Sequence, residues 1–218
     1  MSERLPPPRS AQIRGAGLGA DEVLSLAADA VVVRIHPLGG PHRLDWNEFR
    51  AWGPTRSRFD HHTLPRREHP RRSVMYLTIG TEAFTAAIAE FFQDDGGGVG
   101  PIDRTLRRPA VTLARLQAPV SLLDLASGWV TRAGGNQAIG SGSRARARAW
   151  ARAVYRCHPD LDGLAYHSSV WGPGRCVVLW ERARRSLSST PLASRTLDDP
   201  LLAPALAEAA ERLGAVLL

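Results

Sequence analysis

The side chains best suited to chemistry are arginines and one glutamate in apolar surroundings. Arg34 lies at the end of the β-branched run 31–35, where a buried guanidinium requires a polar partner. Arginine also binds phosphate oxygens through paired hydrogen bonds. Glu90 is flanked by Ala89 and by two phenylalanines, and a carboxylate in such a setting can stabilise a developing positive charge. Side chains of these types could bind an anion and stabilise separated charges. Their positions in the sequence are also compatible with ordinary surface side chains.

Three other sequence patterns give weaker indications of a functional site. His61, His62 and His69 have no cysteine or carboxylate set at ligand spacing, so a metal site is not expected. The glycine-rich residues 96–100 lack both the dinucleotide-binding pattern and a strand–helix–strand context, and they are interpreted as a hinge or surface loop. Arginines at every fourth position within residues 144–152 predict a solvated helix face that could instead contact an acidic partner.

Composition excludes several classes of protein. All 28 basic residues are arginines, and the formal net charge of the 218 residues is +7. The absence of lysine excludes P-loop, Schiff-base and kinase-type lysine chemistry. The two cysteines, Cys157 and Cys176, cannot form a disulfide framework or a four-cysteine zinc site. With no apolar leader and no run of 18 apolar residues, we expect a cytoplasmic protein without a membrane span.

The elements that must position these residues alternate between short strands and helices. β-branched and alternating runs predict strands over residues 31–35, 74–79, 110–116, 122–125, 163–167 and 175–180. Apolar spacing predicts helices over residues 21–30, 82–93, 143–157 and 201–213, the second capped by Thr81. This mixed order indicates the α+β (mixed α/β) class.

The expected organisation is a flexible N-terminal tail over residues 1–20, followed by a single domain over residues 21–218. The tail is rich in proline, glycine and arginine, as loose termini often are. Residues 39–72 show no periodicity and predict a long loop with one helical turn near residues 45–51. A loop of this length inside a compact domain is often functional.

Several of these segments together resemble the RES family, which is named for its Arg, Glu and Ser. The similar segments occur in the family's order and extend over roughly residues 31–213. They are residues 34–37, 58–59, 76–77, 89–93 with 102–104, 122–125, 150–153, 162–169 and 179–183. Two departures are Val33, where the family often has an aromatic residue, and a longer spacing between Tyr76 and Glu90.

The resemblance implies an ADP-ribosyltransferase-like fold with a split β-sheet core that binds NAD as its substrate. RES proteins are typically toxins of bacterial toxin–antitoxin pairs. They degrade NAD by hydrolysis or phosphorolysis, or they transfer ADP-ribose to a protein. Their usual partner is a helix-turn-helix (Xre-like) antitoxin that covers the active site. The resemblance therefore implies a cytoplasmic NAD-consuming enzyme that needs no metal.

The chemistry of NAD cleavage assigns roles to the matching residues. Breaking the nicotinamide–ribose bond develops positive charge on the ribose, as in glycoside cleavage. The residues expected to be catalytic are Arg34, Glu90 and Ser168. Those expected to bind NAD are Arg34, Arg58, Tyr76, Ser168 and Ser169. Ser168 is expected to orient NAD or Glu90 rather than attack, because no nucleophile-elbow motif surrounds it. Ser169 replaces it if the strand register differs by one residue.

Other functions stay open at this point. The net charge alone would fit a nucleic-acid-binding module, but arginines and aromatic residues are not interleaved as in a base-stacking surface. The two departures also fit an inactive family member that is retained as an interaction protein. The choice among hydrolysis, phosphorolysis and protein ADP-ribosylation depends on which acceptor reaches the ribose.

Overall fold

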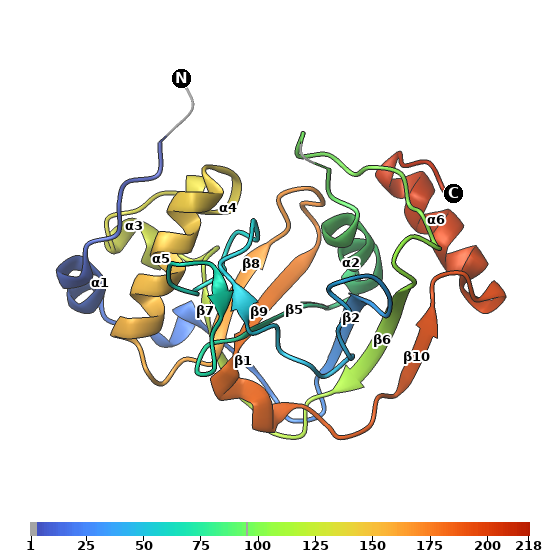
Figure 1. Ribbon diagram of the computed structural model, residues 1–218. Helices are drawn as coiled ribbons and strands as arrows, with labels where there is room; N and C mark the ends of the chain where they lie inside the picture. Colours follow the sequence, from blue (N-terminus) through green and yellow to red (C-terminus); the bar gives the residue numbers. More distant parts are fainter. Residues whose placement is uncertain (1–3, 95) are drawn as a thin grey trace.

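The computed structural model describes residues 4–94 and 96–218. An eight-stranded mixed sheet lies at its centre, in the order β1-β7-β8-β9-β5-β2-β6-β10 (Figure 1). Its strands are β1 (Val23–Leu26), β2 (Val31–Pro37), β5 (Val74–Ile79), β6 (Pro109–Arg115), β7 (Val120–Asp124), β8 (Gly163–His167), β9 (Arg175–Trp180) and β10 (Ala193–Thr196). β7 and β8 are parallel, and a separate ribbon pairs β3 (Trp52–Gly53) with β4 (Arg67–Glu68). The predicted α+β class is confirmed.

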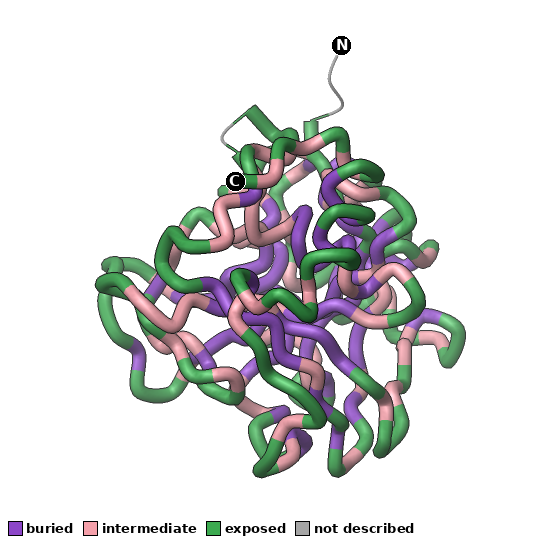
Figure 2. Tube along the Cα trace, turned by 90° about the vertical axis from the view of Figure 1, so that its right-hand side faces the viewer, coloured by how far each residue is buried: buried purple, intermediate pink, exposed green. Residues whose placement is uncertain are grey.

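Two groups of helices cover the same face of the sheet, one over each half. They are α1 (Ser10–Ala16), α3 (Trp129–Arg132), α4 (Ala138–Ser141) and α5 (Arg144–Cys157) over one half, with α2 (Ala83–Phe91) and α6 (Ala203–Leu213) over the other (Figure 1). α5 is amphipathic and buries Trp150 and Val154 against β8 and β9. Figure 2 shows the buried positions concentrated along the central strands. No helix within the described ranges is long and apolar enough to cross a membrane.

The sheet is nearly split between β2 and β5. These neighbouring strands are in register at one pair, Val33 with Thr78, whereas β2 pairs with β6 along seven residues. Register also places Thr78 and Tyr76 on the face that carries α2 and α5. The two halves of the sheet therefore diverge directly beneath the space between these two helices.

The predicted N-terminal tail is wrong for the residues that the structure describes. Of residues 1–20, only 1–3 lie outside the described part of the chain, and α1 forms within the rest. Ile13 is fully buried, and the Trp150 indole nitrogen donates to the carbonyl oxygen of Pro6 at 2.9 Å. A buried indole needs such an acceptor, so this segment completes the core beside α5.

Three further local predictions are wrong. Residues 21–30 form a short 3-10 turn and then β1, which pairs with β7, instead of a helix. Residues 45–51 form no helix, only a turn in which the Glu48 N–H donates to the carbonyl oxygen of Asp45 at 3.1 Å. The N-cap residue of α2 is Glu82 rather than Thr81, and no side chain forms a capping hydrogen bond there. In the first case a long-range strand pairing prevails over a weak local preference for helix.

Candidate active site

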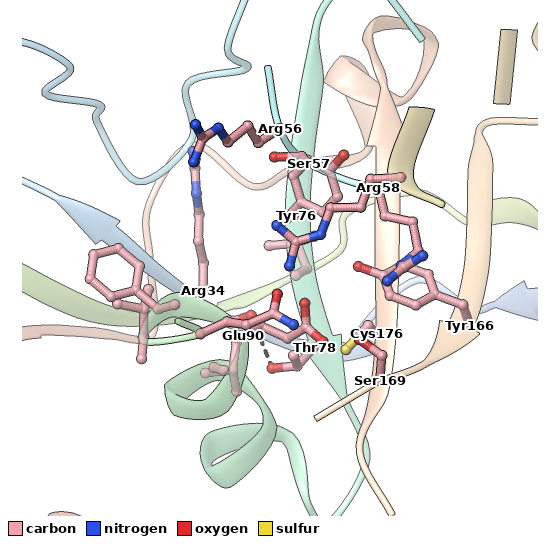
Figure 3. Close-up of a pocket in the computed structure, with 17 residues that line it drawn as sticks. Arg34, Arg56, Ser57, Arg58, Tyr76, Thr78, Glu90, Tyr166, Ser169 and Cys176 are labelled. Atoms are coloured by element: carbon pink, nitrogen blue, oxygen red, sulfur yellow. Dashed lines mark hydrogen bonds between the residues drawn. The ribbon is translucent and has the colours of Figure 1, made fainter. Parts of the chain in front are cut away.

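A cavity of about 340 Å³ lies where β2 and β5 diverge, between the end of α2 and the start of α5 (Figure 3). Its volume falls in the usual range of ligand-binding clefts. Its polar lining comes from seven segments of the chain and consists of Arg34, Arg56, Ser57, Arg58, Tyr76, Thr78, Glu90, Gln93, Arg144, Tyr166, Ser169 and Cys176. Five of the six residues expected at the site are in this set, and Ser168 lies directly behind it.

Ser168 orients the Glu90 carboxylate from behind. Its hydroxyl donates to Glu90 Oε1 at 2.7 Å and accepts from the backbone N–H groups of Val170 at 3.2 Å and Trp171 at 3.0 Å. Because both amides donate to the oxygen, the hydroxyl proton is directed at the carboxylate. Burial raises the pKa of Glu90, while the Ser168 hydrogen bond and the positive charges of Arg58 and Arg144 oppose that rise.

The β8–β9 turn that carries Ser168 is packed tightly on α2. A Cβ atom at Gly174 would lie 2.6 Å from the Ala86 methyl group, so only glycine allows this close approach. The Trp171 indole nitrogen also donates to Glu82 at the start of α2, at 3.1 Å. These contacts place the serine beside the last turn of α2, where Glu90 projects into the cavity.

Arginines face Glu90 from the opposite side of the cavity. Figure 3 shows Arg56 and Arg58 on one side and Glu90 on the other. The Arg58 guanidinium donates to the carbonyl oxygen of Gly142, just before α5. Burial lowers the pKa of Arg58, and the nearby Arg144 lowers it further. The described lining thus combines several guanidinium groups with one carboxylate, which suits an anionic ligand.

Arg144 was not predicted as a site residue, although the sequence contains a signal for it. It occupies the first position of α5 after the Ser143 cap. A cation there opposes the positive end of the helix dipole, so an arginine in the first turn is unfavourable for the helix itself. A second hollow of about 360 Å³ adjoins the first and shares Arg58, Gln93, Arg144 and Ser169 with it.

Arg34 is positioned differently from the expectation. Strand alternation places its side chain on the far face of β2, where it also lines a small void with Met75. Its Nη1 donates to three backbone carbonyl oxygens, of Asp45 at 3.1 Å, Trp46 at 2.6 Å and Glu48 at 2.9 Å. Burial lowers its pKa to about 10. Arg34 borders the cavity through the opening in the sheet and also holds the loop behind it.

We therefore expect Arg34→Ala to destabilise the protein by about 2–4 kcal/mol, because three backbone carbonyl oxygens lose the donor that the buried Arg34 side chain supplies. Urea unfolding followed by circular dichroism measures this loss. Arg43→Ala is the control, since Arg43 is largely exposed and pairs only loosely with Asp45 at 3.7 Å. Equal unfolding midpoints for the two variants would contradict the structural role.

Aromatic side chains form the floor of the cavity. Tyr76 is half-buried, with its hydroxyl group beside Ser57, and burial raises the pKa of that hydroxyl group. Tyr166 packs against Phe59 with ring centroids 4.6 Å apart. Phe91 lines the cavity and offers an apolar surface there. An aromatic ligand group would find flat apolar surfaces here.

The three central histidines lie outside the cavity lining. His61, His62 and His69 are buried between the 54–72 loop and the sheet. Within the described residues, no group of three or more His, Cys, Asp or Glu side chains could hold a metal ion. His62 hydrogen-bonds to Asp60 and lies against the carbonyl oxygen of Arg72, whereas His61 Nε2 lies 3.3 Å from a carboxylate oxygen of Glu181.

Comparisons with known proteins show a fold that is shared with a solved structure. No family profile matches this sequence, and no curated protein matches it. Among solved structures, the chain is similar to a chain in the crystal structure of the M. tuberculosis MbcT–MbcA toxin–antitoxin complex. The TM-score is 0.56 at 17% identity, and the alignment covers 94% of this chain and 95% of that chain. At this identity the likeness shows a common fold.

Proposed function

We propose that this chain is an RES-type toxin that cleaves the nicotinamide–ribose bond of NAD by hydrolysis or phosphorolysis. One observation carries the proposal: Glu90, oriented by Ser168, shares a single cavity with Arg34, Arg58 and Arg144. A dinucleotide carries a pyrophosphate for the arginines and an aromatic ring for the tyrosines. The resemblance in sequence motifs and the fold shared with a toxin–antitoxin complex support the same assignment.

In this mechanism each group has a separate task. Arg58 and Arg144 bind the pyrophosphate, and Tyr76 and Phe91 contact the nicotinamide ring. As the bond breaks, nicotinamide leaves with the bonding electron pair and becomes neutral, while the ribose becomes an oxocarbenium ion. The ionised Glu90 stabilises this cation. Water or phosphate then attacks the anomeric carbon and releases a proton to solvent.

The partner in this proposal is a helix-turn-helix (Xre-like) antitoxin that covers the cavity in a cytoplasmic complex. A second candidate is a protein mono-ADP-ribosyltransferase, which the same cavity serves if a protein side chain reaches the ribose before water does. A nucleic-acid-binding module is less favoured, because Arg58 and Arg144 converge on one cavity with a carboxylate.

The test is product analysis. The purified protein is incubated with NAD, with and without inorganic phosphate, and the products are separated by chromatography. Release of nicotinamide with ADP-ribose supports hydrolysis, and phosphorylated ADP-ribose that forms only with phosphate supports phosphorolysis. Labelled NAD that becomes attached to a protein supports the transferase. If no nicotinamide is released under any of these conditions, the proposed function is wrong.

Ser168→Ala should move the acid limb of the pH–rate profile to higher pH. The Ser168 hydrogen bond lowers the pKa of Glu90, so its loss lets burial raise that pKa further. Because the carboxylate must be ionised to stabilise the cation, activity then falls at a higher pH on acidification. The measurement is kcat/KM against pH, with Ser186→Ala as the matched control, because Ser186 is also buried but lies outside the described lining of the cavity. An unmoved limb in Ser168→Ala would refute this role.

A further inference from the structure

A buried carboxylate closes the turn that brings two arginines to the cavity. Asp60 is fully buried, and its Oδ2 accepts from the backbone N–H of Thr55 at 2.8 Å and from the Thr55 hydroxyl at 3.0 Å. The same oxygen accepts from both terminal nitrogens of Arg50 at 3.1 Å. We call residues 55–60 the arginine turn, because Arg56 and Arg58 project from it into the cavity.

The other carboxylate oxygen is bound just as firmly. Asp60 Oδ1 accepts from the backbone N–H of His62 at 3.1 Å and forms a short hydrogen bond with its Nδ1. On the far side of the ring, His62 Nε2 lies 2.9 Å from the carbonyl oxygen of Arg72. Arg152 of α5 donates to the carbonyl oxygen of His62 at 3.4 Å. Asp60 therefore joins the end of the turn to two other parts of the chain.

Arg50 connects this carboxylate to the strand that carries Tyr76. The backbone N–H and carbonyl groups of Arg50 exchange hydrogen bonds with Val74 of β5, at 2.9 and 3.1 Å. Tyr76 follows two residues later on the same face of β5 as Val74. The chain Thr55–Asp60–Arg50 thus holds the arginine turn at a set position relative to the cavity floor.

Asp60 also balances the charge behind the turn. Burial acts to raise its pKa, but the hydrogen bond from His62 and the positive charge of Arg50 outweigh burial and keep the pKa below its usual range. The carboxylate is therefore ionised at neutral pH. Two arginines in three residues repel each other, and an anion fixed behind them lowers the free energy needed to keep both facing one cavity.

We propose that Asp60 is a positioning residue that holds the arginine turn in the shape that binds the anionic part of a pyrophosphate ligand. The identity of the ligand rests on the proposed function. Binding of a pyrophosphate compound by the turn requires no turnover, so the two ideas can be tested apart. Asp60 itself acts through Thr55 and Arg50 and does not contact the ligand.

Asp60→Asn keeps the size of the side chain but removes its charge. We expect KM for NAD to rise by about tenfold with kcat changed less than about threefold, and the Kd for ADP-ribose to rise by a similar factor. ADP-ribose binding is measured by calorimetry on the full chain. Glu22→Gln is the matched control, because Glu22 is also a buried carboxylate paired with an arginine, Arg132, but lies outside the described cavity lining. The Glu22→Gln variant should be less stable but should keep the wild-type KM for NAD and the wild-type Kd for ADP-ribose.

A milder variant covers the case in which Asp60→Asn does not fold. Thr55→Val removes the hydroxyl donor and leaves the Arg50–Asp60 pair intact, so it should also weaken ADP-ribose binding. Normal binding in the folded variants overturns the inference, as does a wild-type protein that does not bind ADP-ribose. If the wild type binds ADP-ribose but releases no nicotinamide, and the variants bind more weakly, the inference holds and only the proposed function is wrong.

Discussion

Glu90→Gln is expected to lower the rate of NAD cleavage by about 100- to 1,000-fold, the usual loss when one oriented transition-state group is removed. Glutamine fits the same space and can still accept the Ser168 hydrogen bond, but it carries no charge to stabilise the oxocarbenium ion. Because the ground state of NAD lacks that cation, kcat should fall far more than KM rises. Nicotinamide release under saturating NAD measures the effect.

The same substitution should not destabilise the fold, which separates a catalytic role from a structural one. Burial raises the pKa of Glu90, so the folded state favours the protonated carboxyl group. The protonated Glu90 side chain stabilises the folded state at pH values below the ordinary pKa of glutamate. This contribution is lost as the pH rises through the raised pKa of Glu90 in the folded state. Glutamine resembles the protonated form, so Tm at neutral pH should be unchanged or higher. Glu208→Gln, an exposed change on α6, should leave both rate and Tm unchanged.

Arg58→Ala is expected to raise KM for NAD by about 10- to 100-fold, because a charge-assisted hydrogen bond to phosphate contributes about 1.5–3 kcal/mol. The Arg58 side chain lines the cavity with Glu90 and Arg144 and also anchors the loop before α5 through Gly142. Arg58→Lys should recover little of this affinity, because lysine lacks the planar fork that binds two oxygens at once. Steady-state kinetics with NAD measure both variants.

Arg146→Ala provides the control for charge. Arg146 lies on α5 two residues beyond Arg144, and it is outside the described lining of the cavity. Removing it lowers the net charge equally but should leave KM within about twofold, since surface charges are screened over about 10 Å at 0.1 M salt. Equal KM changes in Arg58→Ala and Arg146→Ala would show that general charge, rather than a defined contact, binds the substrate.

Local sequence patterns were sufficient to predict several of the buried strands and helices. The strands over residues 74–79, 163–167 and 175–180 and the helix over residues 143–157 are found within one residue of the predicted bounds. In these segments apolar spacing and the required burial agree, so the local signal is strong. Short edge elements such as β10 lack this signal, because a four-residue strand at the rim of a sheet contains no full period.

The sequence by itself determined the α+β class and the kinds of side chain available for chemistry, including Glu90 and Ser168. Only the tertiary structure decided how they meet, because Ser168 contacts Glu90 across 78 residues of sequence. It also decided that the Arg34 guanidinium holds a loop, that Arg144 lines the cavity and that Asp60 lies behind the arginine turn. The physical reason is that a buried polar group takes whichever partner the packed chain brings within reach, and sequence spacing carries no record of that partner.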